Sequence, residues 1–211
     1  MMKLAILLLL PLMTLGCSKT PLAVNEVNPA QESPSTSVSS SKTPLAVNEV
    51  NQLDQVVLLD VQGLWGGTNL WIVADGKAIC SFVTAPQKGE SGLQETRYAF
   101  SLSDEQRSAL SELVKKHDFF TIHTKARSGV PDEARPVIFV QSGSRSHAVA
   151  KWANDKHQDF DPVYKYLLQV AESGRKGAET KKGAHDRNWK PEGFPENQAI
   201  WDMTNLERDK Q

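Results

Sequence analysis

The chain has 211 residues, of which 39% are hydrophobic and 23% are charged, and its formal net charge is −1. This composition is typical of a soluble domain, and the near-zero net charge implies neither a basic stripe for binding nucleic acid nor a strongly acidic surface. With cysteines only at positions 17 and 80, the sequence predicts one folded domain that packing rather than a disulfide network stabilises.

The first 17 residues form a segment of their own. A basic start at residues 1–3 precedes a largely apolar run at 4–15, and Gly16-Cys17 follows at once. About 20 apolar residues are needed to span a bilayer, so this run is too short for a stable membrane helix and is typical of a signal peptide. The tetrapeptide at 14–17, Thr-Leu-Gly-Cys, resembles the lipobox of bacterial lipoproteins, whose cysteine receives diacylglycerol before the signal is cut.

This resemblance implies a signal peptide at residues 1–16 and a mature chain that begins with lipidated Cys17. Two or more acyl chains hold a protein at a membrane for practical purposes, so it implies a lipid anchor in the cell envelope. Ser18 rather than an aspartate follows the cysteine, which favours the outer membrane over the inner membrane. Acylation of Cys17 leaves Cys80 as a free thiol.

Residues 17–54 are expected to be the lipidated cysteine and a disordered linker. The segment is rich in Ser, Thr, Pro, Asn and Glu and has no aromatic residue, so it lacks the apolar surface that folding requires. Residues 18–28 recur without a change at 41–51, which indicates a recent duplication and a linker whose length is not critical. As a flexible coil, roughly 35 residues span about 30 to 35 Å.

The following segment predicts antiparallel strands. Residues 55–61 are apolar and β-branched, and two further apolar runs at 70–73 and 78–83 flank Asp75-Gly76. Asp-Gly between apolar runs is a strong hairpin signal, because both central residues of a type I′ turn need positive φ. We therefore predict a hairpin at this turn.

A third strand and a helix are expected next. Apolar and polar residues alternate at 96–100, which indicates a strand with one buried face, and Glu95 and Arg97 fall on the other face. Ser103 and Gln106 have the spacing of a capping box, which predicts a helix start. The apolar stripe of this helix consists of Leu110, Leu113 and Val114.

The second half of the domain repeats this organisation. Apolar runs at 137–140 and 147–152 predict another hairpin. Asp161-Pro162 is typical of an N-cap followed by proline at the first helical position, and Gly174 follows the expected last turn. The predicted order is thus β-β-β-α-β-β-α.

Short connections between successive strands exclude a parallel sheet, so we predict an α+β domain at residues 55–174. It would have an antiparallel sheet of about five strands and two helices on one face. The pattern at 102–120, a helix ending in Asp-Phe-Phe between two hairpins, resembles small domains without an assigned activity in bacterial lipoproteins and other secreted proteins. That resemblance implies no functional residue.

Residues 175–211 are predicted to be a polar tail. The tail nevertheless contains Trp189, Phe194 and Trp201, which a solvated tail seldom carries. Two interpretations therefore stay open: the tail packs on the domain as an extended strap, or it is disordered.

Candidate catalytic residues are few, because Gly-x-Ser-x-Gly, His-Glu-x-x-His and paired Cys-x-x-Cys motifs do not occur in this sequence. The densest polar group is Asp155, His157 and Asp159, with His147 upstream. Carboxylates and imidazoles suit a divalent metal ion or general acid–base catalysis. Alternatively, these are ordinary polar residues of a loop between a strand and a helix.

Candidate binding residues lie in two other loops. Gly66-Gly67 beside Trp65 would let a ligand approach the backbone, although a tight turn with a core tryptophan explains the same pattern. Residues 130–136 hold two prolines and the charged Asp132 and Arg135, which suits either a rigid recognition loop or a plain connection in which these two charges pair.

From these patterns we expect a membrane-anchored envelope lipoprotein that acts as a non-enzymatic binding module. The membrane, through the N-terminal lipid, and a protein or envelope ligand are the expected partners, with no cofactor and no nucleic acid. Two alternatives stay open: a metal-assisted or acid–base hydrolase, and a periplasmic enzyme inhibitor that presents residues 130–136.

Overall fold

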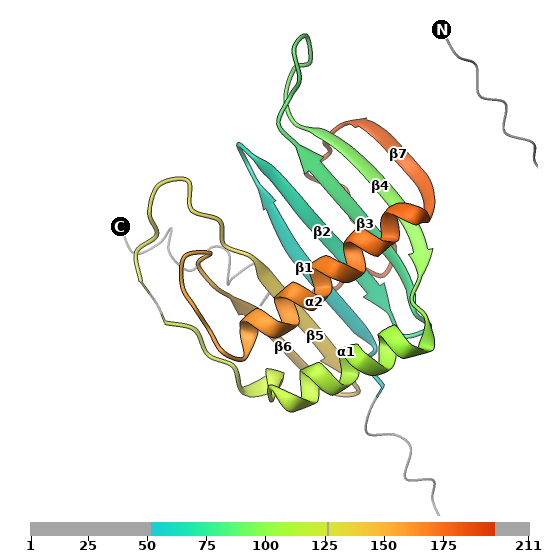
Figure 1. The fold of residues 1–211 in the computed structure, drawn as a ribbon, viewed down its shortest axis with the longest axis vertical. Coiled ribbons are helices and arrows are strands. Elements are labelled where there is room, and N and C mark those ends of the chain that lie inside the picture. The colour runs from blue at the N-terminus through green and yellow to red at the C-terminus, as the bar shows by residue number, and fades with distance from the viewer. Residues whose placement is uncertain (1–51, 126, 197–211) are drawn as a thin grey trace, which may run out of the picture. The chain divides into compact units, whose positions relative to one another are not determined.

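The computed structural model describes residues 52–125 and 127–196, so Cys17, the linker repeat and Trp201 lie outside the described residues. The described residues form a seven-stranded antiparallel sheet with the strand order β6-β5-β1-β2-β3-β4-β7 (Figure 1). The strands are β1 (Gln55–Gln62), β2 (Gly66–Val73), β3 (Lys77–Thr84), β4 (Gln94–Ser101), β5 (Val137–Ser142), β6 (Arg145–Ala150) and β7 (Ala178–Ala184). The helices are α1 (Asp104–Lys116) and α2 (Phe160–Ser173), with 3-10 turns at Phe119–Thr121 and Gly174–Lys176.

The predicted sheet of about five strands in the order β-β-β-α-β-β-α is wrong. The predicted order counted three strands before the first helix and left out the apolar run at 55–61, which forms β1. In addition, β7 follows the last helix, so the order is β-β-β-β-α-β-β-α-β. β1 pairs with both β2 and β5 at the centre of the sheet, where both of its faces are covered, so its sequence lacks the alternation that marks a half-buried strand. β7 is polar because it is an edge strand, and backbone pairing with β4 holds it.

The hairpin between β2 and β3 is confirmed, but its turn is not of type I′. Gly76 has a φ of +82°, whereas Asp75 does not have positive φ. The Gly76 N–H donates to the Val73 carbonyl at 2.8 Å. A left-handed glycine after an ordinary turn closes hairpins with three-residue loops, and it needs only one positive φ.

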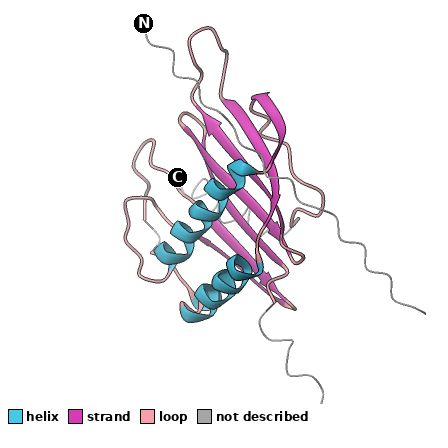
Figure 2. Cartoon of the chain, turned by 45° about the vertical axis from the view of Figure 1, so that its right-hand side comes forward, coloured by secondary structure: helices cyan, strands magenta, loops and turns pink. Residues whose placement is uncertain are grey.

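Both helices pack on one face of the sheet, which we call the helix face (Figure 2). The capping box predicted for α1 is confirmed, since the Ser103 hydroxyl accepts from the Gln106 N–H and the Gln106 side chain accepts from the Ser103 N–H. The core on this face is built around fully buried Phe119 and Phe160.

The start of α2 differs from the prediction. Its N-cap is Asp159, not Asp161, and Pro162 lies inside the first turn, where a missing N–H is tolerated. Asp161 instead accepts a hydrogen bond from the His157 N–H and forms an ion pair with Lys151 at 3.2 Å. These contacts fix the loop that precedes the helix.

The opposite face of the sheet carries a smaller apolar cluster and an extended segment. The cluster contains Val57, Val137, Phe139, Ala148 and Ala150, with Leu59, Trp71 and Phe194 packed against it. After β7, residues 185–196, which we call the strap, cross this face. We call this side of the sheet the strap face. Of the two interpretations of the tail, the described residues up to 196 match the first, because Trp189 and Phe194 pack on the sheet.

Candidate ligand-binding cavity

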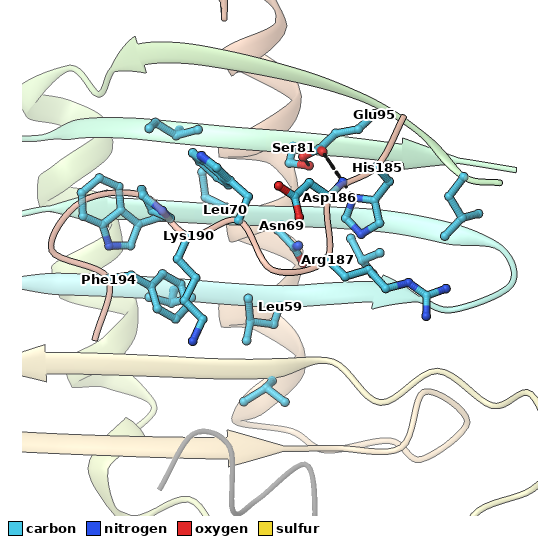
Figure 3. A pocket seen from close by; sticks show the side chains of 18 of the residues that line it. Leu59, Asn69, Leu70, Ser81, Glu95, His185, Asp186, Arg187, Lys190 and Phe194 are labelled. Atoms are coloured by element: carbon cyan, nitrogen blue, oxygen red, sulfur yellow. Dashed lines mark hydrogen bonds and ion pairs between the residues drawn. The ribbon is translucent and has the colours of Figure 1, made fainter. Parts of the chain in front are cut away.

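A cavity of about 600 Å³ lies on the strap face, between the strap and strands β1 to β4 (Figure 3). Its apolar lining comes from the alternate residues of the strands that point away from the helices, among them Leu59, Trp71 and Ile79. His185, Arg187 and other strap residues form the opposite wall. The cavity is therefore apolar on the sheet side and polar along the strap.

A buried charged cluster closes one side of the cavity. Glu95 is 3% exposed and Arg97 is 5% exposed. The Arg97 guanidinium donates to both Glu95 carboxylate oxygens, at 2.5 and 2.9 Å. Ser81 donates to Glu95 at 2.6 Å, and the Lys181 ammonium lies 3.3 Å from the same carboxylate. The Glu95 carboxylate is therefore surrounded by hydrogen-bond donors, two of which are cationic.

These donors set the protonation state of Glu95. Burial alone raises the pKa of a carboxyl group, but the hydrogen bonds from Arg97 and Ser81 outweigh it and hold the pKa of Glu95 at about 2. His185 Nδ1 is 3.3 Å from the carboxylate and joins the strap to it (Figure 3). A carboxylate with so low a pKa is a weak base, so this cluster is suited to holding structure rather than to removing a proton.

Trp189 fastens the middle of the strap. Its ring lies 3.5 Å from the Arg97 guanidinium carbon, which stacks Arg97 between a carboxylate and an aromatic face. Farther along, the Gln55 side chain donates to the Gly193 carbonyl at 2.8 Å. The cavity wall is thus attached at several points and is part of the folded domain.

The cavity lining includes a buried donor that lacks a partner. The Trp71 indole N–H is buried and makes no hydrogen bond with any residue that the structure describes. Burial of an unsatisfied donor costs about 1 to 3 kcal/mol, and native structures contain few such groups.

The side chains of the four residues proposed for metal or acid–base chemistry each contact a partner outside the group. His147 lies on β6 with its Nε2 2.9 Å from the Ile122 carbonyl, and Asp155 accepts from Arg127. His157 Nδ1 accepts from the backbone N–H groups of Asp159 and residue 160. Asp159 itself lies 3.1 Å from His117. The sequence placed these residues near one another in the chain, but the fold directs them to different contacts.

The hydrogen bond with His117 lowers the pKa of Asp159, which favours the ionised carboxylate of a structural pair. Across residues 52–125 and 127–196, no group of three His, Cys, Asp or Glu side chains is arranged to hold a metal ion. We therefore place the candidate site in the cavity and not in this loop.

The predicted binding residues have three different environments. Trp65 is not a core residue: it is 67% exposed in the turn between β1 and β2. Asp132 is exposed and adopts a left-handed φ of +63°. Arg135 packs over the Trp152 ring at 5.1 Å and also lines the cavity.

Glu95 and Arg97 are functional candidates that the sequence interpretation missed. The prediction of one buried face for this strand was wrong, because the strap buries the face that carries the two charges. Opposite charges two residues apart on one strand face, together with a tryptophan in the tail, were the available signal.

Cys80, in contrast, is fully buried. Burial raises the pKa of its thiol to about 11, so it is unreactive at neutral pH.

Within the described part of the chain, no helix combines the length and the hydropathy that crossing a membrane requires. Comparisons with protein-family models, with curated proteins and with solved structures found no match for this chain.

Proposed function

We propose that this protein is a bacterial envelope lipoprotein, anchored through Cys17, whose domain binds an amphipathic ligand in the strap cavity. The ligand would have an apolar body and an acidic group. The observation that carries the proposal is the cavity of about 600 Å³, with its apolar floor and its polar strap wall. Sites for small ligands commonly have volumes of about 300 to 1,000 Å³ and combine apolar walls with a few polar groups.

The charges around the cavity support an acidic ligand group. Among the described lining residues, Arg135, Arg187 and Lys190 are basic, whereas Glu95 and Asp186 are acidic. Glu95 is already paired with Arg97 and Lys181, so its charge is compensated inside the protein. By formal charge, the described lining residues carry three basic and two acidic side chains, and this net charge of +1 favours an anion.

The apolar lining supports a hydrophobic ligand body. Leu59 and Trp71 are only partly buried, and both pack against the apolar cluster on the strap face. Apolar surface that a ligand covers contributes about 25 cal/mol per Å² to binding, and this burial provides the driving force. A hydrolase would instead need the polar residues around positions 147–159 to act together, and their separate partners do not favour it.

Filling the cavity tests the ligand site. We expect Leu59→Trp to weaken the binding of 1-anilinonaphthalene-8-sulfonate, an apolar anion, by about tenfold or more, because the larger ring occupies the floor and removes more than 1.4 kcal/mol of binding free energy. Fluorescence titration of the folded protein measures the affinity.

The matched control is Leu64→Trp, the same substitution at an exposed position outside the cavity lining. It should leave probe affinity unchanged. Equal affinities for the wild type and Leu59→Trp would show that the probe does not occupy this cavity.

The proposed anchor has a separate test. Cys17→Ala removes the sulfur that would carry diacylglycerol, so the protein should move from the detergent-requiring membrane fraction to the soluble fraction. Cys80→Ala, which changes the other cysteine, should leave the protein in the membrane fraction. Retention of the Cys17→Ala protein in membranes would contradict lipid anchoring.

A further inference from the structure

Exposed apolar residues collect at one end of the sheet. Among the described residues, the large hydrophobic side chains that are exposed are Leu64 (62%), Trp65 (67%), Val130 (55%) and Trp189 (37%). The first two occupy the turn between β1 and β2, and Val130 lies in the loop before β5. We call these two loops the apolar tips.

The strand register shows that both tips lie at the same end of the sheet. Gln62 pairs with Gly66 beside the first tip. Val137, the first residue of β5, pairs with Leu59 near the same end of β1. Both loops extend from this end of the sheet in Figure 1, away from the start of β1. The two tips therefore lie at the same end of the sheet.

Trp65, in the first tip, makes no contact within the described part of the chain that would give it a structural role. The Trp65 indole makes no hydrogen bond and no ring contact with other described residues. The backbone beneath it is fixed, because the Arg187 guanidinium donates to the Gly63 carbonyl at 3.2 Å and Gly66 has a φ of +85°. An added Cβ at Gly66 would lie 2.0 Å from the Val83 carbonyl oxygen, so only glycine fits there.

The second tip is also held in place. Glu133 accepts from Arg127 at 2.7 Å, and its N–H donates to the Val130 carbonyl at 3.1 Å. The turn between them contains Pro131 and the left-handed Asp132. The hydrogen bond from Arg127 holds the pKa of Glu133 at about 2, so the support stays charged at neutral pH.

We propose that the apolar tips insert into the interfacial layer of a lipid bilayer. Tryptophan and leucine are favourable in that layer, where an amphipathic ring meets both headgroups and acyl chains. A protein interface of standard size needs a contiguous packed core of about 800 Å² per partner, whereas these tips are separate projections. A bilayer needs no complementary shape, so it accommodates them.

The proposal rests on the proposed function for its location at a membrane. The first strand starts at the end opposite the tips, and an eight-residue strand measures about 27 Å. The chain between Cys17 and Gln55 has roughly 35 residues and can reach about 120 Å when extended. A lipid-anchored domain can therefore turn its tips toward the same membrane.

Tip insertion would also bring the cavity to the bilayer. Gln62, Gly63 and Arg187 belong to the cavity lining and to the first tip or its support. An amphipathic ligand could then pass between the bilayer and the strap cavity without crossing water.

Quenching by brominated lipid tests the insertion. The full-length protein isolated from membranes is reconstituted in phosphatidylcholine vesicles with or without acyl-chain bromine, and tryptophan emission is compared. We expect bromine to reduce wild-type emission and Trp65→Phe to abolish that loss. Trp189→Phe, at the exposed tryptophan of the strap, should retain it.

Two further variants in the Trp65→Phe protein make the test independent of one residue. Val130→Trp, at the second tip, should restore the quenching. Lys77→Trp, at an exposed position at the opposite end of the sheet, should not restore it. Quenching that survives Trp65→Phe, or that is equal for the two introduced tryptophans, would overturn the proposal.

Binding of 1-anilinonaphthalene-8-sulfonate to the wild-type protein, compared with its quenching by brominated lipid, separates this proposal from the cavity proposal. Normal probe binding without lipid quenching would overturn tip insertion alone. Lipid quenching without probe binding would support tip insertion and contradict the cavity proposal.

Discussion

Replacement of Glu95 by glutamine is expected to lower the free energy of unfolding by about 3 to 5 kcal/mol, because it leaves a buried cation without its counter-charge. Arg97 is 5% exposed and directs its guanidinium at the Glu95 carboxylate. The amide retains the shape of the carboxylate but cannot accept both guanidinium bonds as an anion. Urea unfolding of the full chain, followed by circular dichroism, measures the difference.

Two comparisons distinguish the charge effect from a general loss of packing. Glu90→Gln makes the same change at an exposed carboxylate and should change stability by less than about 0.5 kcal/mol. Combining Glu95→Met with Arg97→Met removes both charges, and this double variant should be more stable than Glu95→Gln. If the Glu95→Gln protein is as stable as the wild type, the buried charge of Arg97 does not need the Glu95 carboxylate for stability.

The same residue predicts a specific dependence on pH. Glu95 has a pKa of about 2 in the folded protein, against 4.5 for the ordinary side chain. A group whose folded pKa is depressed stabilises the protein above its unfolded pKa, and this contribution is lost as the pH falls toward the folded pKa. We therefore expect stability to fall between about pH 4.5 and pH 2, and this part of the fall to be absent in Glu95→Gln.

Truncation after residue 184 is expected to destabilise the domain by about 3 kcal/mol and to abolish binding of the anionic probe. It removes the Trp189 ring from Arg97 and Phe194 from the apolar cluster on the strap face. A cation–π contact at a partly exposed ring contributes about 1 kcal/mol, and burial of the phenylalanine side chain contributes about 2 kcal/mol more. The strap also forms one wall of the cavity, so probe binding should be lost with it.

Truncation after residue 196 is the matched control, because the two shortened proteins differ only in residues 185–196. The longer protein should keep the strap, the cavity and probe binding. Differential scanning calorimetry and the fluorescence titration together give both quantities. If the two truncated proteins melt at the same temperature and bind the probe equally, the strap contributes neither stability nor a binding wall.

Local patterns were sufficient where neighbouring residues determine the structure. The Ser103 capping box and the glycine that closes the hairpin at Gly76 depend on residues within one turn, so the sequence located both. The type of the turn at Gly76 was not predicted correctly, because only the register of β2 and β3 shows that the loop between them has three residues. The same limit applied to α2, where Asp159 and not Asp161 occupies the cap.

Environment determined the features that sequence reasoning missed. β1 and β7 are chemically unlike, one apolar and one polar, because one is central and the other is at the edge of the sheet. Likewise, Glu95 and Arg97 are buried only because the strap returns across their face. These positions depend on contacts between segments that are about 90 residues apart in the chain.

The sequence by itself determined the antiparallel pairing of neighbouring strands, the two helices and the apolar stripes, since short-range periodicity and turn chemistry carry that information. It also supplied the lipobox resemblance, which remains the basis of the proposed anchor. Only the tertiary structure decided the strand order, the burial of Glu95, the strap cavity and the exposure of Trp65. The physical reason is that burial and charge pairing arise from long-range contacts, which no local pattern in a single chain specifies.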